Sequence, residues 1–176
     1  MDGIIFDVDG TLWDSVEVVA ESWNLAIKEN SDLEPNLNRE ILQGLFGKTM
    51  DEIAAGVFPD LDPDSRRKLM DICFDYENRY LETHPGVYYE GVMDTLKELA
   101  LEYPLFIVSN CQCGYIEVMM KGAGMEPYIK DFLCFGQTQT SKDQTILKLM
   151  EKNNLTSPVY VGDTPVSYTH LTLPTK

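Results

Sequence analysis

The hydrophobic pattern of this chain alternates between short continuous apolar runs and longer segments with helical spacing. A short run that is apolar on consecutive positions predicts a strand buried on both faces, as in a parallel sheet. Such runs occupy residues 4–6, 105–108, 132–135 and 159–161. From residue 92 onward, helices are expected at 92–101, 115–121 and 144–153, with a short helical turn at 128–131. Strand and helix in alternation predict a parallel sheet with right-handed crossovers, a Rossmann-like α/β core.

A second pattern fills the chain between the first two apolar runs. Ser15 is a good N-cap for a helix that extends to about Asn30, with apolar residues at helical spacing. Further helices are expected at 37–46, 50–58 and 63–84. Residues 14–86 offer no strand candidate, so they are predicted to form an all-helical domain. It is inserted into an α/β core made of residues 1–13 and 87–165.

Composition and charge narrow the class of partner. The chain has 176 residues, 44% of them apolar, so it is expected to be globular. Its net charge of −15 argues against a nucleic-acid surface, which needs clustered lysine and arginine. No apolar run reaches membrane length, and Asp2 does not fit a basic signal-peptide start. A cytoplasmic protein, monomeric or weakly dimeric, is the expectation.

The cysteines do not form a recognisable metal or disulfide pattern. There are four: Cys73, Cys111, Cys113 and Cys134. None makes a CxxC pair, and Cys111 with Cys113 lacks a second pair of zinc ligands. They are expected to be reduced thiols that serve as small apolar residues.

Polar side chains follow the predicted strands at their carboxyl ends. Asp7 and Asp9 follow the first strand, Ser109 and Asn110 the second, and Asp163 the last. Lys142 stands at the start of the last helix. Because open α/β sheets bind ligands at this edge, these groups are expected to meet there.

Assembled, these residue types can perform phosphoryl transfer. Asp7 is the candidate nucleophile, and Asp9 the candidate acid and base. Mg²⁺ prefers hard oxygen ligands, which the carboxylates of Asp7 and Asp163 and a backbone carbonyl can supply, with Asp9 also in the candidate metal set. Donors to the phosphate oxygens are expected from three further side chains, Ser109, Asn110 and Lys142.

The motif Asp7-Val8-Asp9-Gly10-Thr11 resembles the first motif, DxDGT, of the haloacid dehalogenase superfamily. Ser109 resembles the second motif, Lys142 the third, and Gly162-Asp163-Thr164 the start of the fourth. The chain is similar to the phosphoglycolate phosphatase and β-phosphoglucomutase-like members, and residues 14–86 lie where that family places its C1 cap.

The resemblance implies a Mg²⁺-dependent phosphatase that hydrolyses a small organic phosphate through an aspartyl-phosphate. Thr11, within the first motif, is then expected to contact the substrate phosphate. In the cap, the favoured interpretation of the segment around Lys48 is a plain connection between two helices. The alternative is a loop from which Lys48 reaches the substrate.

The chain departs from the family at its end. The fourth motif runs GDTxxD, but Ser167 stands here in place of the second acid. Residues 166–176 resemble a translated sequencing adapter and are expected to be an artefact, which would leave the core incomplete at its C-terminus. A chain cut in this way is expected to be poorly soluble or inactive.

Three alternatives stay open beside the phosphatase. One is a β-phosphoglucomutase-like sugar-phosphate isomerase, and another is an inactive truncated fragment. The third is a receiver-like phosphate-binding module, which the helical insertion and the position of the acids after the first strand disfavour. The sequence does not select a particular phosphate ester.

Overall fold

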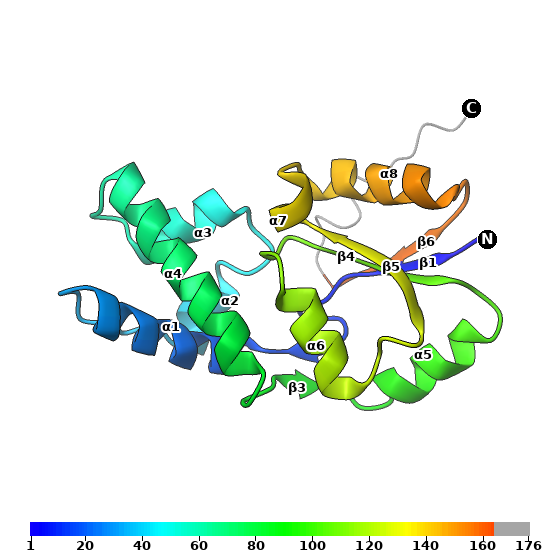
Figure 1. Cartoon of the computed structure of the whole chain (residues 1–176), viewed down its shortest axis with the longest axis horizontal. Coiled ribbons are helices and arrows are strands. Elements are labelled where there is room, and N and C mark those ends of the chain that lie inside the picture. Colours follow the sequence, from blue (N-terminus) through cyan, green and yellow to red (C-terminus); the bar gives the residue numbers. More distant parts are fainter. Residues whose placement is uncertain (164–176) are drawn as a thin grey trace. The chain divides into compact units, whose positions relative to one another are not determined.

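The structure is a computed structural model that describes residues 1–163 (Figure 1). The chain divides into two compact units. The first contains Met1–Trp13 and the chain from Tyr88 onward, and the second is Asp14–Val87. The expected artefactual tail, residues 166–176, and Ser167 within it lie outside the described residues.

The first unit is built on a four-stranded parallel sheet. Its strands are β1 (Ile4–Phe6), β4 (Leu105–Ser109), β5 (Ile129–Cys134) and β6 (Val159–Val161). They lie in the order β5-β4-β1-β6, and every adjacent pair is parallel. The predicted α/β fold with a parallel sheet is therefore confirmed.

Helices cover both faces of this sheet. In Figure 1, α8 (Lys142–Asn153) lies on one face, while α5 (Val92–Ala100) and α6 (Tyr115–Ala123) lie on the other. Alternate side chains of a strand point to opposite faces. Ile5, Phe106 and Val108 accordingly pack in one buried cluster with residues of α8 and the segment after it: Ile146, Leu149, Met150 and Leu155.

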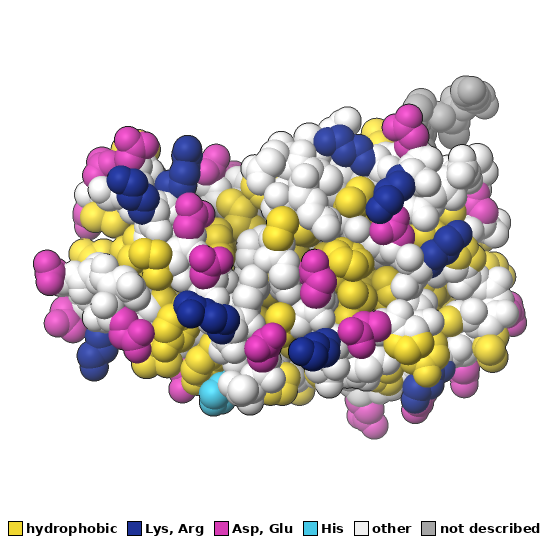
Figure 2. Space-filling view, viewed as in Figure 1, with side chains coloured by type: hydrophobic (Ala, Val, Ile, Leu, Met, Phe, Trp, Pro, Cys, Tyr) yellow, Lys and Arg dark blue, Asp and Glu magenta, His cyan; other side chains and the backbone are white. Residues whose placement is uncertain are grey.

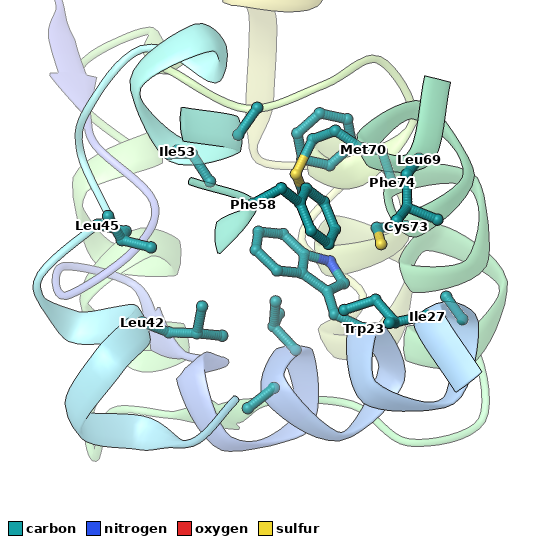
Figure 3. Close-up of a cluster of buried hydrophobic side chains, with 14 of the residues drawn as sticks. Trp23, Ile27, Leu42, Leu45, Ile53, Phe58, Leu69, Met70, Cys73 and Phe74 are labelled. Atoms are coloured by element: carbon teal, nitrogen blue, oxygen red, sulfur yellow. The ribbon is translucent and has the colours of Figure 1, made fainter. Parts of the chain in front are cut away.

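The second unit is helical. Its helices are α1 (Val16–Asn30), α2 (Arg39–Gln43), α3 (Met50–Val57) and α4 (Pro63–Leu81). Figure 3 shows their shared core, in which Trp23 lies among apolar side chains from all four helices and the loops between them. The indole Nε1 of Trp23 donates to Glu77 Oε2 at 2.5 Å, so this buried carboxylate has a polar partner.

The helix starts follow local chemistry. The Asp62 side chain accepts from two backbone N–H groups in the first turn of α4, and Pro63 occupies the first helical position. Thr49 and Glu52 form a capping box at the start of α3.

Several predicted boundaries were wrong. The helix expected at 37–46 is only the five-residue α2. Ile129–Asp131 belong to β5 rather than to a helical turn, and Phe135 begins the short helix α7 (Phe135–Thr138) rather than ending the strand. The reason is that β5 is an edge strand with one neighbour, so polar residues interrupt its apolar run and hide its beginning.

Two strands of two residues each were also missed. They are β2 (Trp13–Asp14) and β3 (Val87–Tyr88), and they pair as a separate two-stranded sheet. Strands this short leave no recognisable period in the sequence.

The surface carries charge of both signs. On the face in Figure 2, acidic side chains (magenta) are interspersed with lysines and arginines (blue), and no continuous basic surface is visible. Among residues 1–163, no helix is long and apolar enough to cross a membrane.

Candidate active site

The segment after β1 forms a tight loop that places two carboxylates at the carboxyl end of the sheet. The Val8 carbonyl accepts from the N–H groups of Thr11, at 3.1 Å, and Leu12, at 2.8 Å. Gly10 sits in this loop with φ of +76°, a conformation that glycine adopts most easily. The loop turns back at once, which leaves Asp7 and Asp9 at the strand end.

Asp7 is buried and held by two hydrogen bonds. Lys142 Nζ, from the first residue of α8, donates to Asp7 Oδ2 at 2.6 Å. The Val8 N–H donates to Asp7 Oδ1 at 2.9 Å. Burial alone would lower the pKa of Lys142, but the negative charge of Asp7 outweighs this and raises it. Lys142 is therefore a cation at neutral pH, beside the candidate nucleophile.

Asp9 is joined to a residue that the sequence analysis did not single out. The Tyr115 hydroxyl donates to Asp9 Oδ1 at 2.5 Å. Tyr115 begins α6, is buried, and its ring packs edge-on against Trp13 with centroids 5.6 Å apart. One signal could have found it: Tyr115 opens the helix that follows the strand of Ser109, so it starts at the same sheet edge.

Asp163 follows β6 and approaches the first motif. Its carboxylate lies where a Cβ on Gly10 would be, so glycine is the residue that admits it. Burial and the negative charge of Asp7 raise the pKa of Asp163. The Asp7 N–H donates to the Val161 carbonyl at 2.8 Å, which links the two motifs through the backbone.

The donor set fits one hard cation between Asp7 and Asp163. The negative charge of Asp7 raises the cost of ionising Asp163, and a divalent cation would offset that repulsion. These two side chains and a backbone carbonyl of the loop would hold Mg²⁺.

The predicted metal set also includes Asp9. Within residues 1–163, no three His, Cys, Asp or Glu side chains gather into a metal-binding group. The predicted metal role of Asp9 beside Asp7 and Asp163 stays a prediction. In the structure one oxygen of the Asp9 carboxylate accepts the hydrogen bond from the Tyr115 hydroxyl.

For four other predicted site residues, the structure gives a position in the fold. Ser109 ends β4, the neighbour of β1, and is buried, and Asn110 follows it at the same edge. The Thr11 hydroxyl is buried and has no hydrogen-bond partner among the described residues, so it is not presented at an open edge. Lys48 belongs to the second unit, between α2 and α3. The roles of these four residues stay predictions.

The parallel α/β core and the carboxylates and lysine at its edge agree with the family that the sequence comparison finds. The chain belongs to the haloacid dehalogenase-like hydrolase family, whose sequence model matches residues 4–168. The predicted resemblance is thereby confirmed. No curated protein matches this chain.

Solved structures of the family share the fold. A haloacid dehalogenase-like hydrolase from Streptococcus pneumoniae superposes with a TM-score of 0.74 at 20% identity, covering 97% of this chain and 79% of its own. A predicted phosphoglycolate phosphatase from Haemophilus somnus 129PT superposes with a TM-score of 0.79 at 22% identity, and the match covers 93% of this chain and 77% of that one. The hydrolase YfnB from Bacillus subtilis, solved bound to magnesium, superposes with a TM-score of 0.66 at 22% identity, and the match covers 93% of this chain and 80% of that one.

Proposed function

We propose that this protein is a Mg²⁺-dependent phosphatase that hydrolyses a small organic phosphate monoester through an aspartyl-phosphate. The observation that carries the proposal is the pairing at the end of β1, where Asp7 bonds to Lys142 and Asp9 to Tyr115. One structural neighbour is described as a phosphoglycolate phosphatase and another as bound to magnesium, which supports the class of reaction and the metal.

In the first step, a carboxylate oxygen of Asp7 attacks the phosphorus of the ester. The bond between phosphorus and the ester oxygen breaks, and the leaving oxygen takes a proton from Asp9. Asp7 suits this role because two hydrogen bonds fix its orientation, which reduces the entropy lost on reaching the transition state.

In the second step, water attacks the phosphorus of the aspartyl-phosphate and gives a proton to Asp9. The bond from phosphorus to the Asp7 oxygen breaks, inorganic phosphate leaves, and both carboxyl groups return to their starting states. The hydrogen bond from Tyr115 holds one oxygen of Asp9, so the other oxygen is directed to the proton that moves.

Charge on the phosphate is balanced by cations. Lys142 supplies one within reach of Asp7, and Ser109 and Asn110 are the proposed hydrogen-bond donors to phosphate oxygens. Mg²⁺, held by Asp7 and Asp163, would supply the further positive charge that phosphoryl transfer needs in an acidic site. The proposed partner is accordingly a small phosphorylated metabolite rather than a nucleic acid.

The test is turnover of p-nitrophenyl phosphate with Mg²⁺ by the purified protein with its fourth motif completed, since residues 166–176 are expected to be an artefact. We expect turnover that a metal chelator abolishes. Asp7→Asn is expected to lower kcat by at least about 10³-fold, because it removes the nucleophile.

Asp94→Asn is the matched control, since Asp94 is an exposed acid of α5 that pairs with the neighbouring Lys97. It should retain the rate of the starting protein. An Asp7→Asn variant that keeps this rate would remove Asp7 as the nucleophile. Absence of turnover by the folded protein with the completed fourth motif would overturn the proposed activity.

A further inference from the structure

A cluster of three thiols lies at the carboxyl edge of the sheet, in a place that the phosphatase chemistry does not use. Cys134 is the last residue of β5 and is paired in register with Ser109, the last residue of β4. Cys111 and Cys113 lie in the segment that follows Ser109. The side chains of both hydrogen-bond to the Cys134 thiol.

The backbone holds these two segments against each other. The Gly136 N–H donates to the Cys111 carbonyl at 3.0 Å. A Cβ on Gly136 would lie 2.5 Å from the backbone nitrogen of Cys113 and 2.9 Å from its sulfur, so only glycine lets the segments approach this closely. The contact between the thiols is therefore part of the packing of the unit.

The three thiols differ in accessibility. Cys113 is exposed, whereas Cys111 and Cys134 are buried, with Cys134 only 1% exposed. The structure joins none of these three cysteines in a disulfide. Because Cys113 is exposed, a reagent larger than water can reach it, and its side chain is hydrogen-bonded to the buried Cys134 thiol.

We propose that Cys113 and Cys134 form a redox-active pair that closes to a disulfide. Cys113 is the entry thiol for a small-molecule disulfide, and Cys134 is the resolving thiol. In the first step the Cys113 sulfur attacks the reagent disulfide, forms a mixed disulfide and releases one thiol. In the second, the Cys134 thiolate attacks the Cys113 sulfur and expels the second thiol. The two protein thiols are oxidised to one disulfide, and the reagent is reduced to two thiols.

The electrostatics of Cys134 suit the resolving step. Hydrogen bonds from the Cys111 thiol, the Gln137 N–H and the Cys113 thiol lower the pKa of Cys134 to about 7, although burial opposes this. A substantial fraction of Cys134 is then thiolate at neutral pH, which is the nucleophilic form. Cys73, in the other unit, has its pKa raised to about 12 by burial and by Glu77, so it offers no competing thiolate.

Closure would constrain the segment after Ser109. Ser109 and Asn110 directly precede the linked residues, so a disulfide would tie the loop that carries the proposed phosphate donors to the start of α7. That consequence rests on the proposed phosphatase function, whereas the thiol chemistry and its test do not.

The test treats the purified full chain with oxidised glutathione and maps its peptides by mass spectrometry without reduction. We expect a peptide that joins Cys113 to Cys134, and its loss on adding dithiothreitol. Cys134→Ser should instead accumulate one glutathione on Cys113, because no thiol resolves the mixed disulfide. Cys113→Ser should leave Cys134 unmodified, because its sulfur is buried. Cys111→Ser is the matched control and should still form the Cys113–Cys134 link.

Unlinked cysteines in the treated protein would overturn the proposal, as would a link of Cys134 to Cys111 in place of Cys113. Modification of Cys134 in Cys113→Ser would remove Cys113 as the entry thiol. Cys134→Ser changes a buried residue and could fail to fold. In that case the proposal is decided by the peptide maps of the unsubstituted chain and of Cys113→Ser, because Cys113 is exposed and its substitution should not disturb folding. None of these readouts requires phosphatase activity.

Discussion

Two residues beside the candidate catalytic carboxylates, Tyr115 and Gly10, make contacts that form only in the folded chain. Tyr115 is distant from Asp9 in the sequence, yet its hydroxyl bonds to that carboxylate. Gly10 stands in the first motif, and its missing side chain makes room for Asp163. Each contact leads to a substitution whose effect can be measured.

Tyr115→Phe removes the hydroxyl and leaves the ring against Trp13. Hydrogen bonds to charged groups contribute about 1.5–3 kcal/mol, so we expect kcat to fall at least about tenfold while KM changes little. Steady-state kinetics on p-nitrophenyl phosphate measure both constants. Tyr103→Phe, in the loop before β4, is the control and should behave as the starting protein. An unchanged kcat in Tyr115→Phe would show that this hydroxyl does not position Asp9.

Gly10→Ala should destabilise the protein. Its Cβ would collide with the Asp163 carboxylate, and φ of +76° is strained for alanine. We expect the free energy of unfolding in urea to fall by about 1–3 kcal/mol. The control is Gly44→Ala, where φ is −71° and the nearest atom to a Cβ is 3.5 Å away. That change should be neutral or stabilising by up to about 1 kcal/mol. Equal effects of the two substitutions would contradict the assigned role of Gly10.

At the scale of elements, α8 connects the site to the edge of the sheet. Its first residue, Lys142, bonds to Asp7, and its last turn is tied to β5. There Asp131 accepts hydrogen bonds from Lys152 Nζ at 2.9 Å and Asn153 Nδ2 at 2.7 Å. The same helix thus places Lys142 beside Asp7 at one end and is held to β5 by hydrogen bonds at the other.

The anchor at Asp131 predicts a pH-dependent contribution to stability. Burial opposes ionisation, but hydrogen bonds from Asn153, Lys152 and the Phe132 N–H outweigh it and lower the pKa of Asp131. The contribution is therefore complete above the unfolded-state pKa of about 3.9 and is lost as pH falls through the folded-state pKa.

Asp131→Asn should lower the free energy of unfolding by about 1 kcal/mol at pH 7, and by less at pH 3. Urea unfolding at both pH values measures this. Asp94→Asn, at an exposed acid, should show little difference at either pH. A constant difference between Asp131→Asn and the starting protein would refute the role of the ionised carboxylate.

At the scale of the whole molecule, the order of strands explains why the motifs meet. From β1 the sheet extends through β4 to β5, and the chain then crosses back to place β6 on the other side of β1. Ligands of α/β sheets bind where the winding reverses, at the carboxyl ends of the strands. Asp7 follows β1 and Asp163 follows β6, so both lie at that point.

The fold and much of the site could be predicted because their signals are local. The runs at 105–108 and 159–161 are apolar on consecutive positions, and they became β4 and β6. Where the local signal was weak, prediction failed: β5 begins with polar residues on an edge, and β2 and β3 are too short to show a period.

The sequence by itself determined the parallel α/β core, the helical insertion and the first motif with its two acids, because periodicity and motif spacing depend on neighbouring residues. Only the tertiary structure decided that Lys142 bonds to Asp7, that Tyr115 bonds to Asp9, and that three thiols meet beside Ser109. The physical reason is that each of these contacts joins residues from different strands and helices. Such residues come together only when the sheet has formed and its carboxyl ends lie on one edge.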